Sequence, residues 1–307
     1  MGWQDEIEAA AARIRGHVVR TPVLEFDGFG LDRPVALKLE QMQHTGSFKA
    51  RGAFNTLLSL DVPEAGIVAA SGGNHGAAAA YAASRLGHPA KIFVPEMAGA
   101  SKIALIERAG ADLTVVSGAY ADALEAALEH EARTGAMQIH AYDAQPTVAG
   151  QGTCFREWEE QGLEADTVLI AVGGGGLIGG ALAWFAGRRK VVAVEPRTSC
   201  ALNAALEAGG PVDVEVSGIA ANALGARRIG SICYDLAVEY GAVPVLVEDD
   251  AIAAAQLALW QQLRQLVEPA GAAALSALMS GAYVPEPGEK VAVLVCGANP
   301  APDPLGV

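Results

Sequence analysis

Short segments of β-forming residues alternate with longer segments of helical periodicity along most of this chain. The predicted strands cover residues 35–39, 66–69, 91–94, 112–116, 168–172, 191–194, 243–247 and 291–295. The predicted helices cover residues 76–86, 101–109, 119–134, 148–161, 177–187, 250–266 and 270–280. Strands that alternate with helices and are apolar throughout indicate parallel sheets covered by helices on both faces. The chain is therefore predicted to be an α/β protein.

Bulk composition narrows the classes of partner and compartment. The formal net charge is −14 and no Lys/Arg block occurs, which argues against nucleic acid or an anionic membrane as a partner. Cys154, Cys200, Cys233 and Cys296 show no CxxC spacing, so neither a zinc ribbon nor a disulfide framework is predicted. The N-terminus is acidic and lacks the apolar segment of a signal peptide. A cytoplasmic protein is the prediction that fits best.

The uncharged stretch 167–187 is long enough to cross a bilayer, but it contains seven glycines, four of them consecutive. Glycines between a β-rich segment and an Ala/Leu-rich segment favour a buried strand, a tight turn and a buried helix. We therefore predict no membrane span here.

Lys49 lies at a predicted helix start, after a strand that ends near Glu40 and a turn at residues 45–47. The positive potential of a helix N-terminus lowers the pKa of a lysine and favours the neutral amine that imine formation requires. Lys49 is therefore a candidate to hold a carbonyl cofactor as a Schiff base. Taken alone, the lysine fits an ordinary solvated side chain after a turn better than it fits a cofactor site.

The second motif, Ser-Gly-Gly-Asn-His-Gly at residues 71–76, opens the next predicted helix. Small residues let backbone N–H groups point outward at a helix start, so this turn can hold an anion such as a substrate carboxylate. Asn74 can donate to a phenolate-like oxygen, and His75 is a candidate general base. A tight strand-to-helix turn without a ligand is the alternative.

The third motif is the glycine run at residues 173–176, followed by Leu177. Consecutive glycines between a strand and a helix can form a phosphate cradle of backbone N–H groups. The run also fits the dinucleotide fingerprint G-x-G-x-x-G, with Glu195 about twenty residues on, so an NAD-dependent oxidoreductase is an alternative. NAD binding, however, gives no role to Lys49 or to the motif at 71–76.

The fourth motif ends the last predicted strand at Cys296. A thiol at a strand end can meet a ring nitrogen of a cofactor, or it can be a buried small residue without a ligand. Glu268 precedes Pro269 at a predicted helix start, where we expect it to be exposed unless a neighbouring group holds it inward.

These four motifs, in this order, resemble those of fold-type II PLP (pyridoxal-phosphate-dependent) enzymes, in particular the serine/threonine dehydratases, which are ammonia-lyases. The resemblance extends from about Arg20 to Asn299. It implies a tryptophan-synthase-beta-like fold of two lobes, each with a mainly parallel sheet covered by helices, and PLP between them. The large lobe would comprise residues 1–50 and 146–307, and the small lobe residues 51–145.

The resemblance also implies a role for each motif. Lys49 would carry the cofactor and, once freed by substrate, remove the α-proton. Phe48 would pack against the cofactor ring, Asn74 would bind its phenolic oxygen, and Cys296 would face its pyridine nitrogen. The residues implied in phosphate binding are Gly173, Gly174, Gly175, Gly176 and Leu177. The residues implied in substrate binding are Ser71, Gly72, Asn74 and His75.

Departures from the family pattern refine the expected reaction. A neutral thiol at Cys296 does not stabilise a protonated ring as an aspartate would, which suits prompt loss of a β-hydroxyl group rather than transamination. The resemblance implies that racemases of the family carry a serine at the position of Gly72. Because this chain has no side chain there, racemisation is disfavoured. Some members of the family bind a divalent cation through a glutamate at the position of Glu195 and an acidic residue six positions later. That later position is Ala201 in this chain. Hence no divalent metal is predicted, and Glu195 is a candidate only for a monovalent cation such as K⁺.

The predicted reaction is β-elimination from L-threonine or L-serine, which yields a 2-oxo acid and ammonia. Open alternatives are 3-hydroxyaspartate dehydration, serine racemisation, β-replacement and a non-catalytic PLP-binding protein. The substrate side chain is expected to lie near the irregular stretch 209–231. The resemblance suggests a homodimer, and a chain that ends soon after Asn299 is expected to lack an allosteric C-terminal domain.

Overall fold

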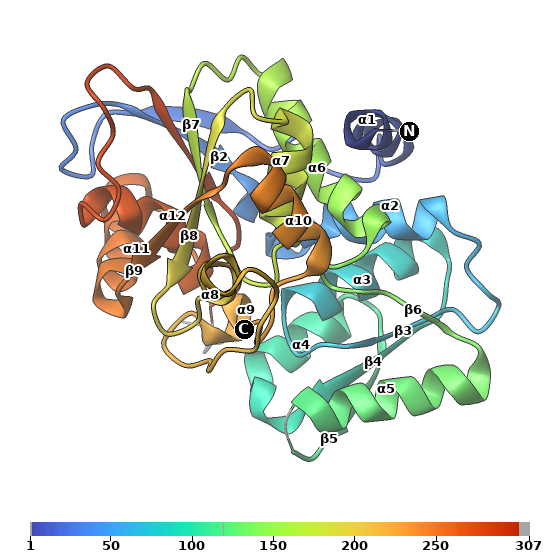
Figure 1. Ribbon diagram of the computed structural model, residues 1–307. Helices are drawn as coiled ribbons and strands as arrows, with labels where there is room; N and C mark the ends of the chain where they lie inside the picture. The colour runs from blue at the N-terminus through green and yellow to red at the C-terminus, as the bar shows by residue number, and fades with distance from the viewer. Residues whose placement is uncertain (1, 119, 301–307) are drawn as a thin grey trace.

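Two separate sheets organise the chain, each covered by helices (Figure 1). The computed structural model describes residues 2–118 and 120–300. It confirms the predicted α/β class, because both sheets are mainly parallel. Every strand of the smaller sheet lies between residues 67 and 138, and the larger sheet takes its strands from both sides of this interval. The lobe boundaries given above stay a prediction, and residues 301–307 lie outside the described part.

The larger sheet has six strands in the order β1-β2-β10-β7-β8-β9. They are β1 (Val23–Phe26), β2 (Val35–Leu39), β7 (Thr167–Ala171), β8 (Lys190–Pro196), β9 (Val243–Val247) and β10 (Val291–Val295). All neighbouring pairs are parallel except β1 with β2. Because β2, β10 and β7 are parallel neighbours, their carboxyl ends lie side by side, and the segments that follow them meet at one edge of the sheet.

The smaller sheet has four parallel strands in the order β5-β4-β3-β6. They are β3 (Ile67–Ala70), β4 (Ala90–Pro95), β5 (Asp112–Val116) and β6 (Met137–Gln138). β3 is central in this sheet, and its carboxyl end leads directly into the motif at residues 71–76.

The helices cover the faces of both sheets (Figure 1). The α-helices are α1 (Trp3–Arg13), α2 (Lys49–Ser59), α3 (Asn74–Leu86), α4 (Ala100–Arg108), α5 (Tyr120–Thr134), α6 (Gln145–Glu160), α7 (Gly176–Phe185), α8 (Ala201–Ala208), α9 (Ala221–Leu224), α10 (Ser231–Tyr240), α11 (Asp249–Leu263) and α12 (Pro269–Met279). The 3-10 helices are η1 (Glu40–Met42), η2 (His44–Gly46) and η3 (Glu96–Ala98). The first residue of the helix predicted at 119–134 lies outside the described part. The sequence patterns did not reveal β1, β6, α1, α8, α9 or α10.

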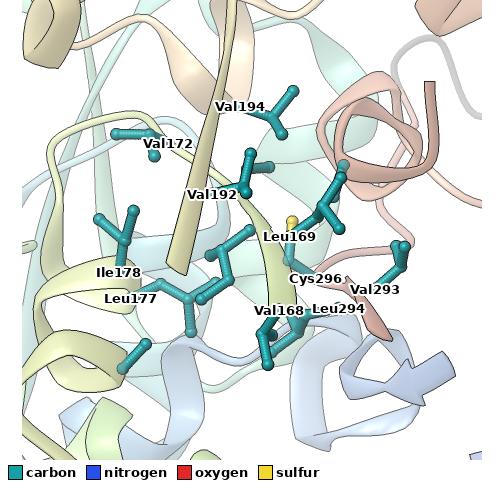
Figure 2. Close-up of a cluster of buried hydrophobic side chains, with 14 of the residues drawn as sticks. Val168, Leu169, Val172, Leu177, Ile178, Val192, Val194, Val293, Leu294 and Cys296 are labelled. Atoms are coloured by element: carbon teal, nitrogen blue, oxygen red, sulfur yellow. The ribbon is translucent and has the colours of Figure 1, made fainter. Parts of the chain in front are cut away.

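The core of the large lobe is formed by apolar side chains of β7, β8, β10 and α7 (Figure 2). The stretch 167–187 folds as β7, a glycine turn and α7, so its lack of charge reflects burial in this core. No helix in the described part of the chain is both long and apolar enough to span a membrane. Cys296 belongs to the same cluster and directly follows β10 (Figure 2).

A buried cluster of charged side chains fixes the junction between β2 and α2. The Arg51 guanidinium donates to Glu40 at 2.7 and 2.9 Å and to Glu157 at 2.9 and 3.1 Å. Lys38 of β2 also donates to Glu157, at 2.6 Å. Although burial opposes ionisation, Arg51 and Lys38 hold the pKa of Glu40 below its ordinary value. The paired charges therefore hold the first turn of α2, and with it Lys49, in place.

Candidate active site

The loop before Lys49 is held in a strained conformation by the segment that follows β10. Thr45 has φ 59°, a left-handed value that is unusual for a β-branched residue. The side-chain amide of Asn299 donates to the Thr45 carbonyl at 2.7 Å, and the Ala298 N–H donates to the Gly46 carbonyl at 2.8 Å. Such strain persists only where the surroundings over-determine it, and it is typical of functional sites.

Lys49 is the first residue of α2, and its amine points toward the segment that connects β6 to α6. Its Nζ donates to the Ala141 carbonyl at 2.8 Å and lies 5.1 Å from the centre of the Phe48 ring. Burial lowers the pKa of Lys49 to about 8, and the negative charge of Glu268 acts in the opposite direction. The predicted lowering is thus present, but desolvation is its main cause rather than the helix terminus that the sequence suggested.

The turn at residues 71–76 forms as expected between β3 and α3. The Ser71 hydroxyl oxygen accepts hydrogen bonds from the N–H groups of Gly73 at 3.3 Å and Gly76 at 3.0 Å. A side-chain methyl at Gly72 would overlap Ala98, so this position packs against η3. The hydroxyl of Ser71 therefore shapes the turn, while its role toward a substrate stays a prediction.

His75 is buried, and its ring contacts the backbone that directly follows β6. Its Nε2 lies 2.9 Å from the Ile139 carbonyl, which requires a proton on that nitrogen. Burial lowers the pKa of His75 to about 3, and the positive charge of Lys49 acts in the same direction. A neutral imidazole tied to a carbonyl is suited to fixing the turn, and a substrate contact by His75 stays a prediction.

Asn74 connects the two lobes through both ends of its side-chain amide. Its Nδ2 donates to the carboxylate of Glu268 at 2.5 Å, and its Oδ1 accepts from Asn299 at 2.8 Å. Glu268 is only 2% exposed, so it is not exposed at the helix start, and Asn74 is the neighbouring group that holds it inward. Sequence reasoning gave Glu268 no role in the site, because its partner Asn74 is 194 positions away.

The glycine run lies at the start of α7, where the first N–H groups of a helix have no intrahelical acceptor. Gly175 has φ 94°, and a side chain there would overlap the Cys233 sulfur. A side chain at Gly174 would overlap the ring of Tyr142, which directly follows the Ala141 that binds Lys49. Glycine is therefore required sterically, and the run lies next to the segment that contacts Lys49.

Cys296 is a buried, neutral thiol at the carboxyl end of β10. Its Sγ donates to the Ala270 carbonyl of α12 at 3.3 Å. Burial raises the pKa of Cys296 well above its ordinary value, and the negative charge of Glu268 adds to this effect. The side chain can therefore present a protonated thiol, but not a thiolate, to a ring nitrogen.

Glu195 lies near the carboxyl end of β8, and backbone N–H groups occupy its carboxylate. Its two carboxylate oxygens accept the N–H groups of Leu202 and Asn203 at 2.8 Å each, at the start of α8. A carboxylate used in this way is not free to bind a ribose, which weighs against the NAD alternative. In the described residues no cluster of three or more His, Cys, Asp or Glu side chains could hold a metal ion. The K⁺ site at Glu195 stays a prediction.

A second residue that sequence reasoning missed is Lys102 of α4. It is 3% exposed, and its Nζ donates to the Asn222 carbonyl of the large lobe at 3.4 Å. The same nitrogen would lie 3.7 Å from a side chain placed at Gly73. Burial lowers the pKa of Lys102, and Glu268 opposes this effect. The sequence around Lys102, a helix of mixed composition, does not indicate that this lysine is buried against the large lobe.

Comparison with known proteins places these features in one family. Residues 14–297 match the family described as pyridoxal-phosphate dependent enzyme, and the chain belongs to it. Fold-type II PLP enzymes are thus confirmed as the class, with the fold expected from the resemblance.

The relatives of this chain include dehydratases or ammonia-lyases and also racemases. The chain is 36% identical to the phenylserine dehydratase of Ralstonia pickettii, over 95% of this chain and 92% of the relative. It is 35% identical to the L-threonine ammonia-lyase of Thermotoga maritima, over 86% of this chain and 67% of the relative. Maize serine racemase superposes with a TM-score of 0.93 at 30% identity, covering 98% of this chain and 95% of that one. The T.th. threonine deaminase superposes with a TM-score of 0.90 at 32% identity, covering 98% of this chain and 99% of that one.

The residues present fit pyridoxal phosphate. The glycine run offers N–H groups where side chains would collide with Tyr142 and Cys233, and such a cradle suits a phosphate group. The second N–H of Asn74 has no acceptor within the described ranges 2–118 and 120–300. The buried hydroxyl groups of Thr45 and Ser47, beside Phe48 and Lys49, likewise have no partner among the described residues. A buried site with unmatched donors and a lysine of lowered pKa is chemically suited to this cofactor.

Proposed function

We propose that this chain is a PLP-dependent ammonia-lyase that eliminates the β-hydroxyl group of L-threonine or L-serine. The observation that carries the proposal is the Lys49 amine. Its pKa is lowered to about 8, it lies 5.1 Å from the centre of the Phe48 ring, and the Glu268 carboxylate acts on it electrostatically. Relatives named threonine ammonia-lyase and phenylserine dehydratase support the reaction type.

Each protein group has a task that its surroundings allow. The N–H groups of the glycine run would bind the phosphate, and the free N–H of Asn74 would donate to the phenolic oxygen. The Cys296 thiol would face the ring nitrogen without giving it a full positive charge. Pyridoxal phosphate, when bound, supplies a ring that withdraws electrons from the α-carbon of an amino acid.

Lys49 is the group that moves the proton. A pKa near 8 leaves a usable neutral fraction of the amine at physiological pH, so Nζ can accept the α-proton. The α-proton and the β-hydroxyl group leave as the elements of water. The remaining enamine converts to its imine tautomer, and addition of water to the imine yields a 2-oxo acid and ammonia. The reaction is therefore balanced without a further reactant.

Gly72 supports elimination over racemisation. Racemisation needs a second group that exchanges a proton on the other face of the α-carbon. Position 72 carries no side chain, and an added methyl group would overlap Ala98 of the small lobe. The structural similarity to maize serine racemase makes racemisation the second candidate function.

Release of 2-oxo acid from a panel of substrates tests the proposal. L-threonine, L-serine, 3-phenylserine and 3-hydroxyaspartate should each be assayed for 2-oxo acid and for the D-enantiomer. We expect 2-oxo acid from L-threonine or L-serine with the highest kcat/KM, loss of turnover after PLP is removed, and recovery when PLP is returned. A preference for 3-phenylserine would correct the substrate, D-amino acid as the main product would favour racemisation, and no 2-oxo acid from any of the four would refute the dehydratase assignment.

A further inference from the structure

Glu268 has an unusual position for a residue at a helix start. It is the N-cap of α12, where a carboxylate normally accepts hydrogen bonds from the first N–H groups of its own helix. Here the side chain makes no such bond, and it reaches instead to Asn74 in the small lobe. The carboxylate is therefore available to the active site rather than to α12.

The backbone around Glu268 places the carboxylate beside the segment that follows β10. The Glu268 N–H donates to the Gly297 carbonyl at 3.3 Å, and Gly297 directly follows Cys296. A methyl group at Gly297 would overlap the Oε1 atom of Glu268. Glycine at 297 thus allows the carboxylate to pack against the backbone there.

The hydrogen bonds of Asn74 define the orientation of its amide. An ionised carboxylate only accepts hydrogen bonds, so the NH₂ group of Asn74 must face Glu268. The Asn74 oxygen is occupied by Asn299, whose NH₂ group also donates to the Thr45 carbonyl. One N–H of Asn74 remains to serve a ligand, and its direction is fixed by Glu268 and Asn299 together.

The charges around Glu268 favour its ionised form. Lys102 of α4 and Lys49 of α2 both attract its negative charge, and the third titratable neighbour, the Cys296 thiol, is neutral. Burial raises the pKa of Glu268 to about 7, while Lys102, the Asn74 hydrogen bond and Lys49 lower it. The carboxylate is therefore ionised above neutral pH, within electrostatic reach of the Lys49 nitrogen.

We propose that Glu268 is a positioning residue: it orients Asn74 toward the phenolic oxygen of the cofactor, and its negative charge stabilises a protonated nitrogen at Lys49. This inference rests on the proposed function, because it requires PLP bound through Lys49. It assigns two separable contributions to one side chain, a hydrogen bond and a charge.

Two variants of the holoenzyme separate these contributions. Glu268→Gln keeps an oxygen that can accept from Asn74 but removes the charge, whereas Glu268→Ala removes both. The readouts are the pH midpoint of the long-wavelength absorption of the bound cofactor and the dissociation constant of PLP. Glu289→Gln is the matched control, because it removes a carboxylate that precedes β10 at the opposite end of the strand from Cys296.

The expected results differ between the variants. Both Glu268 variants should lower the pH midpoint by roughly one unit, because a nearby negative charge no longer favours the protonated nitrogen. Glu268→Ala should also weaken PLP binding about tenfold, as loss of a charge-assisted hydrogen bond predicts, while Glu268→Gln should bind PLP nearly as wild type does. Glu289→Gln should leave both readouts unchanged.

Several outcomes would overturn the inference. An unchanged midpoint in Glu268→Gln would remove the electrostatic role, and wild-type PLP affinity in Glu268→Ala would remove the orienting role. If these variants do not fold, Gly297→Ala provides the test, because its methyl group displaces the carboxylate and should lower the midpoint likewise; a wild-type midpoint there contradicts the inference. Failure of the proposed function is distinguishable, since wild type would then show no cofactor band or release no 2-oxo acid.

Discussion

The side-chain nitrogen of Lys49 donates a hydrogen bond to the main-chain oxygen of Ala141, 2.8 Å away across 92 positions of sequence. Ala141 lies in the segment that leads from β6 of the smaller sheet to α6, which packs on α7 of the large lobe. The bond thus connects the candidate catalytic amine to the segment through which the chain passes from the small lobe back to the large lobe. The next residue, Tyr142, lies against the glycine run. The segment that contains Ala141 and Tyr142 therefore contacts both the Lys49 amine and the glycine run proposed to bind the phosphate.

Arg51 should be essential for stability, because it neutralises two buried carboxylates. Arg51→Ala leaves Glu40 and Glu157 buried with only Lys38 as a cationic partner, and we expect a loss of about 3–5 kcal/mol in the free energy of unfolding. Denaturant unfolding followed by circular dichroism measures it. Lys290→Ala is the control, since its ion pair with Glu164 is largely exposed and should contribute little. Equal losses in the two variants would contradict this account of the charged cluster.

Gly175 should be required for both backbone conformation and space. Gly175→Ala places a side chain at φ 94° and against the Cys233 sulfur, so we expect PLP binding to weaken by at least about tenfold together with a lower Tm. Equilibrium titration of the PLP-free protein with PLP measures the affinity. Gly187→Ala separates the two effects, because Gly187 has φ 77° but no neighbour within 4 Å. It should lower Tm without changing PLP affinity, and a comparable affinity loss there would show that the cradle is not the cause.

His75 should make the protein sensitive to acid. Its pKa is near 3 when folded and about 6.5 when unfolded, so the unfolded chain binds more protons between these values and stability falls as the pH drops below 6.5. This single group should cost about 1.4 kcal/mol at pH 5.5 relative to pH 8. The difference in unfolding free energy between wild type and His75→Gln, measured across this range, isolates the effect. A difference that does not change with pH would show that His75 is not buried in its neutral form.

The regular elements were predictable where their patterns are local. The strands β2, β5, β9 and β10 have the predicted bounds, and the strand-to-helix turns at 71–76 and 173–176 occur where the glycines indicated. The start of α10 was not predictable in this way. Asp143 accepts the N–H groups of Ser231 and Ile232 at 3.0 Å, so the cap of that helix comes from a distant part of the chain.

The same distinction applies to the site. Lys49, Asn74, the glycine run and Cys296 belong to motifs that can be read in the sequence, and the structure brings Lys49, Asn74 and Cys296 around Glu268. Glu268 and Lys102 are polar residues whose burial depends on partners in the other lobe. No local pattern encodes such partners, so their place in the site emerged only with the fold.

The central claim is that Lys49 carries pyridoxal phosphate and performs the proton transfer. Absorption spectra of wild type and Lys49→Ala, each saturated with PLP and then treated with borohydride, test it most directly when combined with a 2-oxo acid assay on L-threonine and L-serine. We predict that wild type shows a long-wavelength cofactor band that disappears on reduction and that it releases 2-oxo acid, whereas Lys49→Ala shows neither. A borohydride-sensitive band or turnover in Lys49→Ala would mean that another residue holds the cofactor, and would contradict the account.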